Sequence, residues 1–300
     1  MRRIALLLVL IAALGGCNRD GEEPQGLARI ALDFQPNAVH AGLLFGRTID
    51  PIVPGSSTDS LKLLASRRVD MAVVDIHDLG LARERGEDIV GVAALVQRPL
   101  AAVIARSGVA RPRDLEGRRV GVTGLPSDDA VLRAVVEHDG GDYSKVKRTT
   151  IGFSAVPSLI AGRVDAVVAF WNAEGVALRQ RGVRTREFRV DDYGAPRYPE
   201  LVLATRRATL RNRPVAIQAT LDRLRHNTVV ALRDREATIR ELVRASGADE
   251  ALMRAELDAV GPALLPPMRL DREALEEWAR FDARFGILDR PPDVDRAFAL

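Results

Sequence analysis

Two segments of the chain repeat one pattern, and this repeat most limits the folds that the sequence can adopt. Residues 63–82 (LLASRRVDMAVVDIHDLGLA) and 159–177 (LIAGRVDAVVAFWNAEGVA) each read as a helix, a turn with Val-Asp, an apolar strand, a polar loop and a helix with glycine. The continuous apolar runs are typical of strands buried in a parallel sheet. The repeat favours two similar lobes, although two βα units also resemble each other by chance.

Strands and helices alternate along most of the remaining chain. Apolar runs such as residues 90–97 are followed by segments of helical period, and the pattern is helical from Pro214 onward. This alternation predicts an α/β fold with mostly parallel sheets. We expect residues 27–106 to form the first part of lobe I, 107–204 to form lobe II, and 205–300 to return to lobe I with C-terminal helices.

The N-terminus has the features of a bacterial lipoprotein. Met1-Arg2-Arg3 precedes an apolar run that is too short to span a membrane, and the run ends in Leu14-Gly15-Gly16-Cys17, which resembles a lipobox. We expect residues 1–16 to be a signal peptide, Cys17 to be lipidated, and 17–26 to be a polar tether. The protein would then be periplasmic and anchored to a bacterial cell membrane. An ordinary signal peptide with an incidental cysteine is the alternative.

Composition excludes several classes of function. The 44 basic and 41 acidic residues are interleaved, with a net charge of +3, so no basic stripe indicates a nucleic-acid partner. A single cysteine excludes an intrachain disulfide and zinc sites built on cysteine pairs. The histidines are scattered and no phosphate-loop motif is present, so the sequence predicts no metal and no cofactor.

Polar side chains follow both repeated strands, where ligands bind in open parallel sheets. Asp75, His77 and Asp78 follow the first strand, and Trp171, Asn172 and Glu174 follow the second. An aromatic face together with carboxylates indicates a planar ligand with amino groups, or a cation, in a cleft between the lobes. Two alternatives stay open: Trp171 fills the core of its lobe, and Glu174 is a solvated acid in a first helical turn.

One further segment has two interpretations. Thr123, Gly124, Ser127 and Asp128 resemble a helix start that binds an anion, but helix capping explains the same residues at least as well.

Several motifs, in the same order, resemble those of the NMT1/THI5-like solute-binding proteins. The matching segments are residues 31–43 (ALDFQPNAVHAGL), 57–105, 169–178 (AFWNAEGVAL), 190–206 (VDDYGAPRYPELVLATR) and 278–298. The resemblance covers nearly the whole mature chain. It implies a two-lobed periplasmic-binding-protein fold of type II that closes on its ligand and feeds the permease and ATPase subunits of an ABC importer. It also implies a pyrimidine precursor of thiamine, such as formylaminopyrimidine or hydroxymethylpyrimidine.

By matched position, the resemblance assigns ligand contacts to seven residues. They are Phe34, Asn37 and His40 in the first lobe and Trp171, Asn172, Glu174 and Tyr193 in the second. The reading of the strand ends adds Asp75. Phe34 stands where the family usually has tryptophan, so an indole N–H is lost. Most of the helix that usually follows H-x-G is missing after Leu43, which would widen the pocket or change the ligand.

Other functions compete with this one. A protein of the same fold could bind riboflavin, sulfonate or nitrate, although acidic strand ends repel anions. The fungal relatives synthesise the pyrimidine with a cysteine-rich iron motif, and this chain has no cysteine in its folded part, so we expect no enzyme. A sensor that docks a partner without transport is a further alternative, which neighbouring permease and ATPase genes would disfavour.

Overall fold

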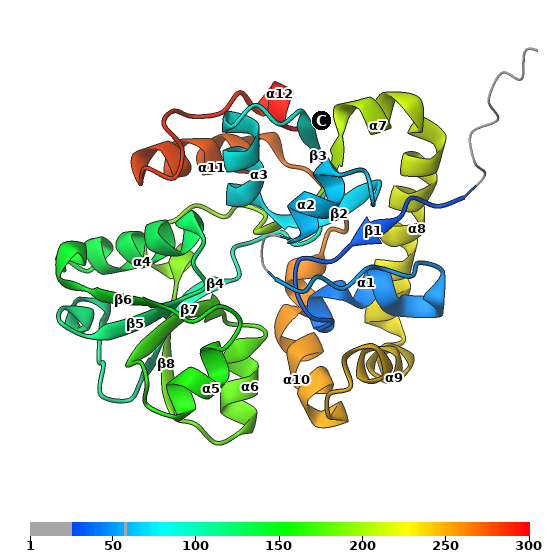
Figure 1. Ribbon diagram of the computed structural model, residues 1–300. Coiled ribbons are helices and arrows are strands. Elements are labelled where there is room, and N and C mark those ends of the chain that lie inside the picture. The colour runs from blue at the N-terminus through cyan, green and yellow to red at the C-terminus, as the bar shows by residue number, and fades with distance from the viewer. Residues whose placement is uncertain (1–25, 57–58) are drawn as a thin grey trace, which may run out of the picture.

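The computed structural model describes residues 26–56 and 59–300 (Figure 1). The predicted signal peptide, residues 1–16, lies outside the described residues, as does the predicted lipidation site Cys17 with most of the tether. Among the helices of the described part, none is both long enough and apolar enough to cross a membrane. The lipid anchor on Cys17 therefore stays a prediction.

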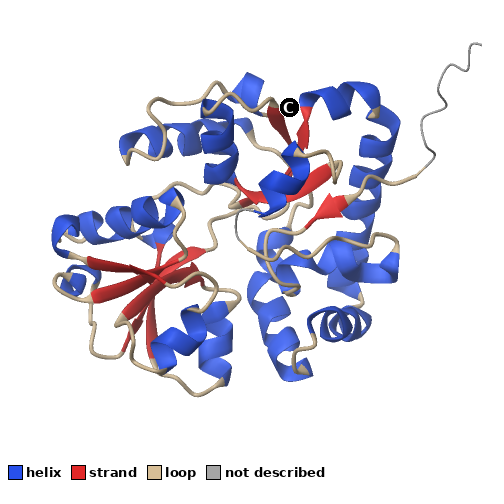
Figure 2. Cartoon of the chain, viewed as in Figure 1, coloured by secondary structure: helices blue, strands red, loops and turns tan. Residues whose placement is uncertain are grey.

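Helices and strands alternate through most of the chain, as the sequence predicts (Figure 2). The strands are β1 (Ile30–Ala31), β2 (Met71–Asp75), β3 (Ile89–Ala94), β4 (Ala101–Arg106), β5 (Arg119–Val122), β6 (Lys147–Thr150), β7 (Ala166–Phe170), β8 (Thr185–Arg189) and β9 (Leu201–Arg206). The α-helices are α1 (Ala41–Leu44), α2 (Asp59–Ala65), α3 (Ile76–Glu84), α4 (Pro126–His138), α5 (Ala155–Ile160), α6 (Glu174–Gln180), α7 (Arg207–Asn212), α8 (Pro214–Arg233), α9 (Arg235–Ser246), α10 (Glu250–Val260), α11 (Arg272–Arg284) and α12 (Val294–Ala297). The short 3-10 helices are η1 (Ala38–His40), η2 (Phe45–Arg47), η3 (Pro112–Leu115), η4 (Tyr143–Lys145), η5 (Val190–Asp192) and η6 (Gly261–Leu264).

Two sheets form the centres of two lobes, which confirms the predicted two-lobed α/β architecture (Figure 1). The first sheet has the order β1-β2-β9-β3 and the second has the order β6-β5-β7-β4-β8. Both sheets are mixed, whereas we expected mostly parallel ones. β9 runs antiparallel to β2 and β3, and β4 runs antiparallel to β7 and β8. Apolar periodicity reports that a strand is buried but not its direction, which explains the difference.

The chain crosses between the lobes twice, and both crossings come earlier than predicted. β4 joins the second sheet and β9 joins the first, so the predicted boundaries after residues 106 and 204 place each strand in the wrong lobe. The crossings instead lie in residues 95–100 and 190–200, between the last strand of one sheet and the first of the next. Both strands are apolar apart from their ends, which are Arg106 in β4 and Thr205 and Arg206 in β9, so their composition does not tell which sheet they enter.

Helices cover both faces of the second sheet, with α4 on one side and α5 and α6 on the other (Figure 1). In the first lobe, α8 and α9 pack on the very short α1, and α10 packs on η1. A Cβ on Gly42 would lie 2.1 Å from the Thr228 hydroxyl oxygen, so only glycine lets α1 approach α8 this closely. The C-terminal helices thus hold the segment that leads from β1 into the cleft.

Candidate functional site

A cavity lies between the two lobes at the ends of the repeated strands. Its wall includes Asp75 at the end of β2 and Phe170 at the end of β7, together with Glu200 from the second crossing. The cavity encloses about 120 Å³. One water needs roughly 10–15 Å³ on the same measure, so a small molecule of one ring is accommodated. The position agrees with the rule that α/β sheets bind ligands beyond their strand ends.

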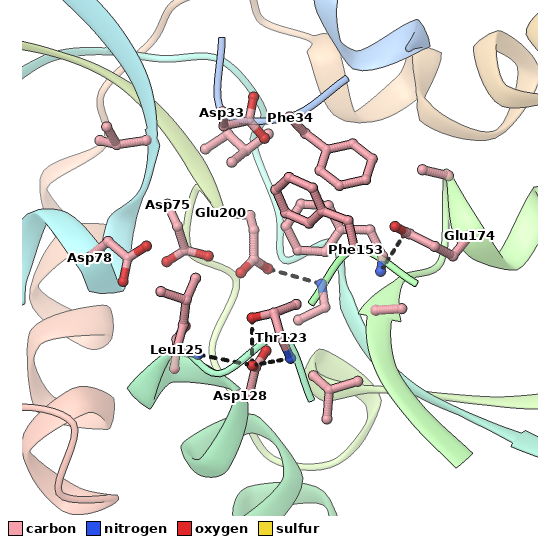
Figure 3. A pocket seen from close by; sticks show the side chains of 18 of the residues that line it. Asp33, Phe34, Asp75, Asp78, Thr123, Leu125, Asp128, Phe153, Glu174 and Glu200 are labelled. Carbon is pink, nitrogen blue, oxygen red and sulfur yellow. Dashed lines mark hydrogen bonds between the residues drawn. The ribbon is translucent and has the colours of Figure 1, made fainter. Parts of the chain in front are cut away.

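Two phenylalanines meet in the cavity from opposite lobes (Figure 3). The rings of Phe34, after β1, and Phe153, after β6, have centroids 4.4 Å apart at an interplanar angle of 78°. This edge-to-face contact joins the lobes, and it gives a ring-shaped ligand apolar surface on both sides of the cleft. Phe34 was predicted at the site and Phe153 was missed. The signal for Phe153 was an aromatic residue three positions after the end of β6, with no acidic side chain beside it.

Six acidic side chains line the cavity, and among the described residues no lysine, arginine or histidine does. The acids are Asp33, Asp75, Asp78, Asp128, Glu174 and Glu200 (Figure 3). Burial raises the pKa of most of them, to about 6 for Asp78, because the low-dielectric interior penalises the charged form. An acidic wall of this kind favours ligands that donate hydrogen bonds or carry positive charge, and it repels anions.

Asp75 lies at the end of a lobe I strand, and Glu200 lies in the second crossing between the lobes. Asp75 ends β2 and caps α3, with its Oδ1 accepting from the His77 N–H at 2.8 Å. Glu200 immediately precedes β9, and its Oε2 accepts from the N–H groups of Leu100 at 2.7 Å and Ala101 at 3.0 Å. The carboxylate of one crossing is thus bonded to the backbone of the other. Sequence reasoning missed Glu200 because the crossing was placed four residues too late.

Helix capping, and not anion binding, explains the start of α4. The Asp128 carboxylate accepts from the N–H groups of Thr123 at 2.7 Å, Gly124 at 3.0 Å and Leu125 at 3.3 Å, and from the Thr123 hydroxyl at 2.6 Å. These are the donors that a bound anion would require, and the protein's own carboxylate occupies them.

Glu174 lies at the cavity wall and not in solvent. It begins α6, and its Oε2 accepts from the Phe170 N–H at 3.1 Å, so the carboxylate turns back toward the end of β7. Burial raises its pKa, and the neighbouring Asp33 raises it further. The sequence-based alternative of a solvated first-turn acid is therefore wrong.

Trp171 does not line the cavity, which corrects the prediction that it stacks on the ligand. Only 3% of its surface is exposed, and it belongs to the hydrophobic core. Its indole N–H donates to the Pro99 carbonyl at 3.1 Å, and the guanidinium of Arg189 lies 4.2 Å from the ring centroid. Successive side chains of a strand point to opposite faces. Phe170 takes the cavity face, so Trp171 turns into the core.

Two other predicted ligand contacts, Asn172 and Tyr193, also lie behind or away from the cavity wall. Asn172 is 1% exposed and absent from the wall, because the turn after β7 folds it inward next to Trp171. Tyr193 follows η5 and packs edge-on against His138 and Phe188, with each pair of ring centroids 5.8 Å apart. This packing holds the ring within lobe II and keeps it out of the cleft.

His40 holds Asp33 in position from outside the cavity wall. It is fully buried, and its Nδ1 accepts from the Asn37 N–H at 3.3 Å, so its Nε2–H donates to the Asp33 carboxylate at 2.8 Å. His40 thereby orients Asp33 into the cavity without lining it. Asn37 does line the cavity, while its Oδ1 accepts from the Val39 N–H at 2.9 Å and caps η1. Asp33 was missed although it adjoins Phe34 in the same sequence motif.

A buried network of polar side chains lies next to Asp75 and outside the cavity wall. His77 faces Asp282 through Nδ1 at 2.7 Å and the Tyr198 hydroxyl through Nε2 at 3.1 Å. Although burial alone would lower it, the carboxylates of Asp282 and Asp75 raise the pKa of His77 to about 10. Asp75, His77 and Glu200 offer atoms within 4.8 Å of one another, a spacing that a metal could use. Both nitrogens of His77 already have partners, so the cluster is satisfied without an ion.

The sequence is similar to a known protein family and to several known proteins. The family model described as NMT1/THI5 like matches residues 48–238. The chain is 34% identical over 222 residues to a formylaminopyrimidine-binding protein of Halalkalibacterium halodurans, covering 69% of this chain and 67% of that protein. It is 30% identical over 190 residues to a putative thiamine biosynthesis protein of Haemophilus influenzae, covering 58% and 60%.

A more distant relative is an enzyme. The chain is 25% identical over 166 residues to the yeast protein 4-amino-5-hydroxymethyl-2-methylpyrimidine phosphate synthase THI13 of Saccharomyces cerevisiae, covering 50% of this chain and 47% of that protein. The chain thus spans about half the length of this relative and 60% of the Haemophilus protein.

Solved structures share the fold. The alkanesulfonate-binding protein SsuA of Xanthomonas axonopodis pv. citri, bound to MOPS, superposes with a TM-score of 0.75 at 18% identity, covering 93% of this chain and 99% of that chain. The periplasmic aliphatic sulphonate binding protein SsuA of Escherichia coli has a TM-score of 0.74 at 16% identity, covering 92% and 97%. These likenesses confirm the two-lobed periplasmic-binding-protein fold.

Proposed function

Because this chain belongs to the NMT1/THI5-like family, we propose that it is the solute-binding component of an ABC importer and binds a pyrimidine precursor of thiamine. The ligand would be of the formylaminopyrimidine or hydroxymethylpyrimidine type. The observation that carries the proposal is the cavity wall, which combines two opposed phenylalanine rings with six acids and no basic side chain among the described residues. An aminopyrimidine offers an apolar ring and amino donors, and the wall offers the matching partners.

The two lobes contribute different parts of the binding site. Phe34, Asn37 and Asp75 come from lobe I, and Phe153 and Glu174 come from lobe II. A ligand held by both sides stabilises the closed arrangement, which is how binding proteins of two lobes signal that they are loaded. Permease and ATPase subunits of the importer would then recognise the closed form.

The acidic wall disfavours the anionic ligands of the same fold. A sulfonate or nitrate would require basic side chains or free backbone N–H groups, and Asp128 already fills the donor cluster at the start of α4. A synthase of the THI5 type is the second candidate, favoured by the resemblance to the yeast enzyme. It lacks support from this chain, whose single cysteine is Cys17.

We further propose that Cys17 carries the lipid and that the protein faces the periplasm. The lipobox-like sequence before Cys17 supports this location, as does the fold shared with periplasmic binding proteins. Metabolic labelling with a radioactive fatty acid should mark the wild-type protein and leave a Cys17→Ser variant unmarked.

Calorimetric titration of the purified protein tests the ligand. We expect formylaminopyrimidine or hydroxymethylpyrimidine to bind at micromolar concentration or below, and methanesulfonate and nitrate not to bind. Absence of binding by both pyrimidines would refute the proposed ligand class. Formation of a pyrimidine phosphate in the presence of pyridoxal phosphate and iron would favour the synthase.

A further inference from the structure

Asp75 and Glu200 form a pair of carboxyl groups at the centre of the cleft. Their side chains face each other in Figure 3, and with His77 they place oxygen and nitrogen atoms within 4.8 Å of one another. Two ionised carboxylates this close in a buried site repel each other, so the protonated form of one of them is favoured.

The groups around Asp75 and Glu200 do not supply enough positive charge to keep both carboxyl groups ionised. His77 is the one cation beside the pair among the described residues, but its Nδ1 is paired with the Asp282 carboxylate at 2.7 Å. The other titratable neighbours are Asp78 on α3 and Tyr198, neither of which brings positive charge. Burial raises the pKa of both Asp75 and Glu200. The spacing and the burial of the two acids therefore favour one proton and one negative charge on the pair.

Hydrogen bonding distinguishes the two members of the pair. Glu200 accepts two backbone N–H groups through one oxygen, from Leu100 and Ala101, whereas Asp75 accepts only that of His77. Each N–H donor favours the ionised form of the carboxyl group that it contacts. The negative charge is thus better stabilised on Glu200, and the proton is better placed on Asp75.

We propose that Asp75 is the protonated member and Glu200 the ionised member of this pair, and that together they select ligands in which a ring nitrogen adjoins an amino group. Asp75 donates its O–H to the ring nitrogen, and Glu200 accepts from the amino group. This inference rests on the proposed function and names the edge of the ligand that determines specificity. A ligand without the ring nitrogen cannot accept from the Asp75 O–H, so it loses this hydrogen bond.

Two amide substitutions distinguish the members of the pair. Asp75→Asn mimics the protonated acid: its oxygen still accepts from the His77 N–H, and its amide group donates to both Glu200 and the ligand. We expect Asp75→Asn to lose clearly less affinity for hydroxymethylpyrimidine than Glu200→Gln does. Glu200→Gln keeps an oxygen for the two backbone N–H groups but removes the charge, and we expect at least a roughly tenfold loss.

The matched control is Glu256→Gln, which neutralises a buried acid on α10 that does not line the cavity. We expect it to bind like wild type. Thermal unfolding of each variant checks that the fold is intact. We also expect the wild type to bind 2-amino-4-methylbenzyl alcohol, which keeps the substituents but lacks the ring nitrogens, at least about tenfold more weakly than hydroxymethylpyrimidine.

Infrared spectroscopy reports on the proton without any ligand. We expect the C=O stretching band of a protonated carboxyl group to lose intensity in Asp75→Asn relative to wild type. An unchanged band, a loss of affinity in Asp75→Asn equal to that in Glu200→Gln, or unchanged affinity in both variants would overturn the inference. Failure of the wild type to bind any aminopyrimidine would instead refute the proposed function, and the infrared result would still decide where the proton lies.

Discussion

Replacing Trp171 with alanine tests whether this residue belongs to the hydrophobic core or contacts the ligand. Its surface is 97% buried, since only 3% is exposed, and its indole N–H is bonded to the Pro99 carbonyl at 3.1 Å. Truncation of a buried tryptophan to alanine typically costs about 3–5 kcal/mol, from lost contacts and the cavity left behind. For a chain of this size each kcal/mol lowers the melting temperature by about 2–4 °C. We therefore expect Trp171→Ala to melt on the order of 10 °C below wild type.

The assay pairs urea unfolding with calorimetric titration at a temperature where the variant stays folded. We expect the affinity of Trp171→Ala to remain within about threefold of wild type, because the ring lies outside the cavity wall. Trp171→Phe keeps a ring beside Arg189 but loses the N–H, so it should cost about 1 kcal/mol. Phe34→Ala is the opposite control: it should lose roughly tenfold in affinity with little change in unfolding.

One result would refute this reasoning about Trp171. If Trp171→Ala unfolds at the same urea concentration as wild type but no longer binds hydroxymethylpyrimidine, the ring contacts the ligand and the core assignment is wrong.

Three other substitutions give direct tests. Phe153→Ala should weaken binding roughly tenfold in calorimetry, because it removes the lobe II partner of Phe34, and unchanged affinity would place the ligand elsewhere. Gly42→Ala should destabilise the protein by about 1–3 kcal/mol in urea, since its Cβ meets the Thr228 hydroxyl, and Thr228→Ala in the same chain should recover part of the loss. Burial raises the pKa of Glu256 from 4.5 to about 8, so the folded protein is progressively penalised as pH rises from 4.5 through 8. Glu256→Gln should therefore be more stable than wild type at pH 9 by a few kcal/mol, since each unit of pKa shift corresponds to about 1.4 kcal/mol. At pH 4 the two proteins should have nearly equal free energies of unfolding. A difference in stability that does not grow with pH would contradict this prediction.

The strand ends could be located from the sequence because a βα unit has a fixed geometry. A buried apolar strand followed by a helix places the residue between them at the open edge of a sheet, which is where Asp75 and Glu174 lie. The motif around Phe34 and Asn37 was likewise informative, since it starts directly after β1. Whether these side chains contact the ligand remains a prediction.

The side of a strand that faces the cleft could not be read from the sequence. The run from Ala166 through Trp171 is apolar on both faces, so the alternation that separates inside from outside is absent. Glu200 was missed for a different reason, because the direction and sheet of β9 depend on pairing with distant strands. Such pairing is a property of the tertiary structure, and local pattern carries little information about it.

The position of β9 has a consequence for how the chain reaches its folded state. β9 lies between β2 and β3, yet it follows the whole of lobe II in the sequence. During synthesis, β2 and β3 emerge early with open edges and have no partner between them until Leu201–Arg206 arrives. Lobe II, whose strands are contiguous, can close first. Lobe I must therefore wait with unpaired apolar strand edges exposed, and its protection from aggregation depends on how quickly the inserted lobe folds or on what covers those edges meanwhile.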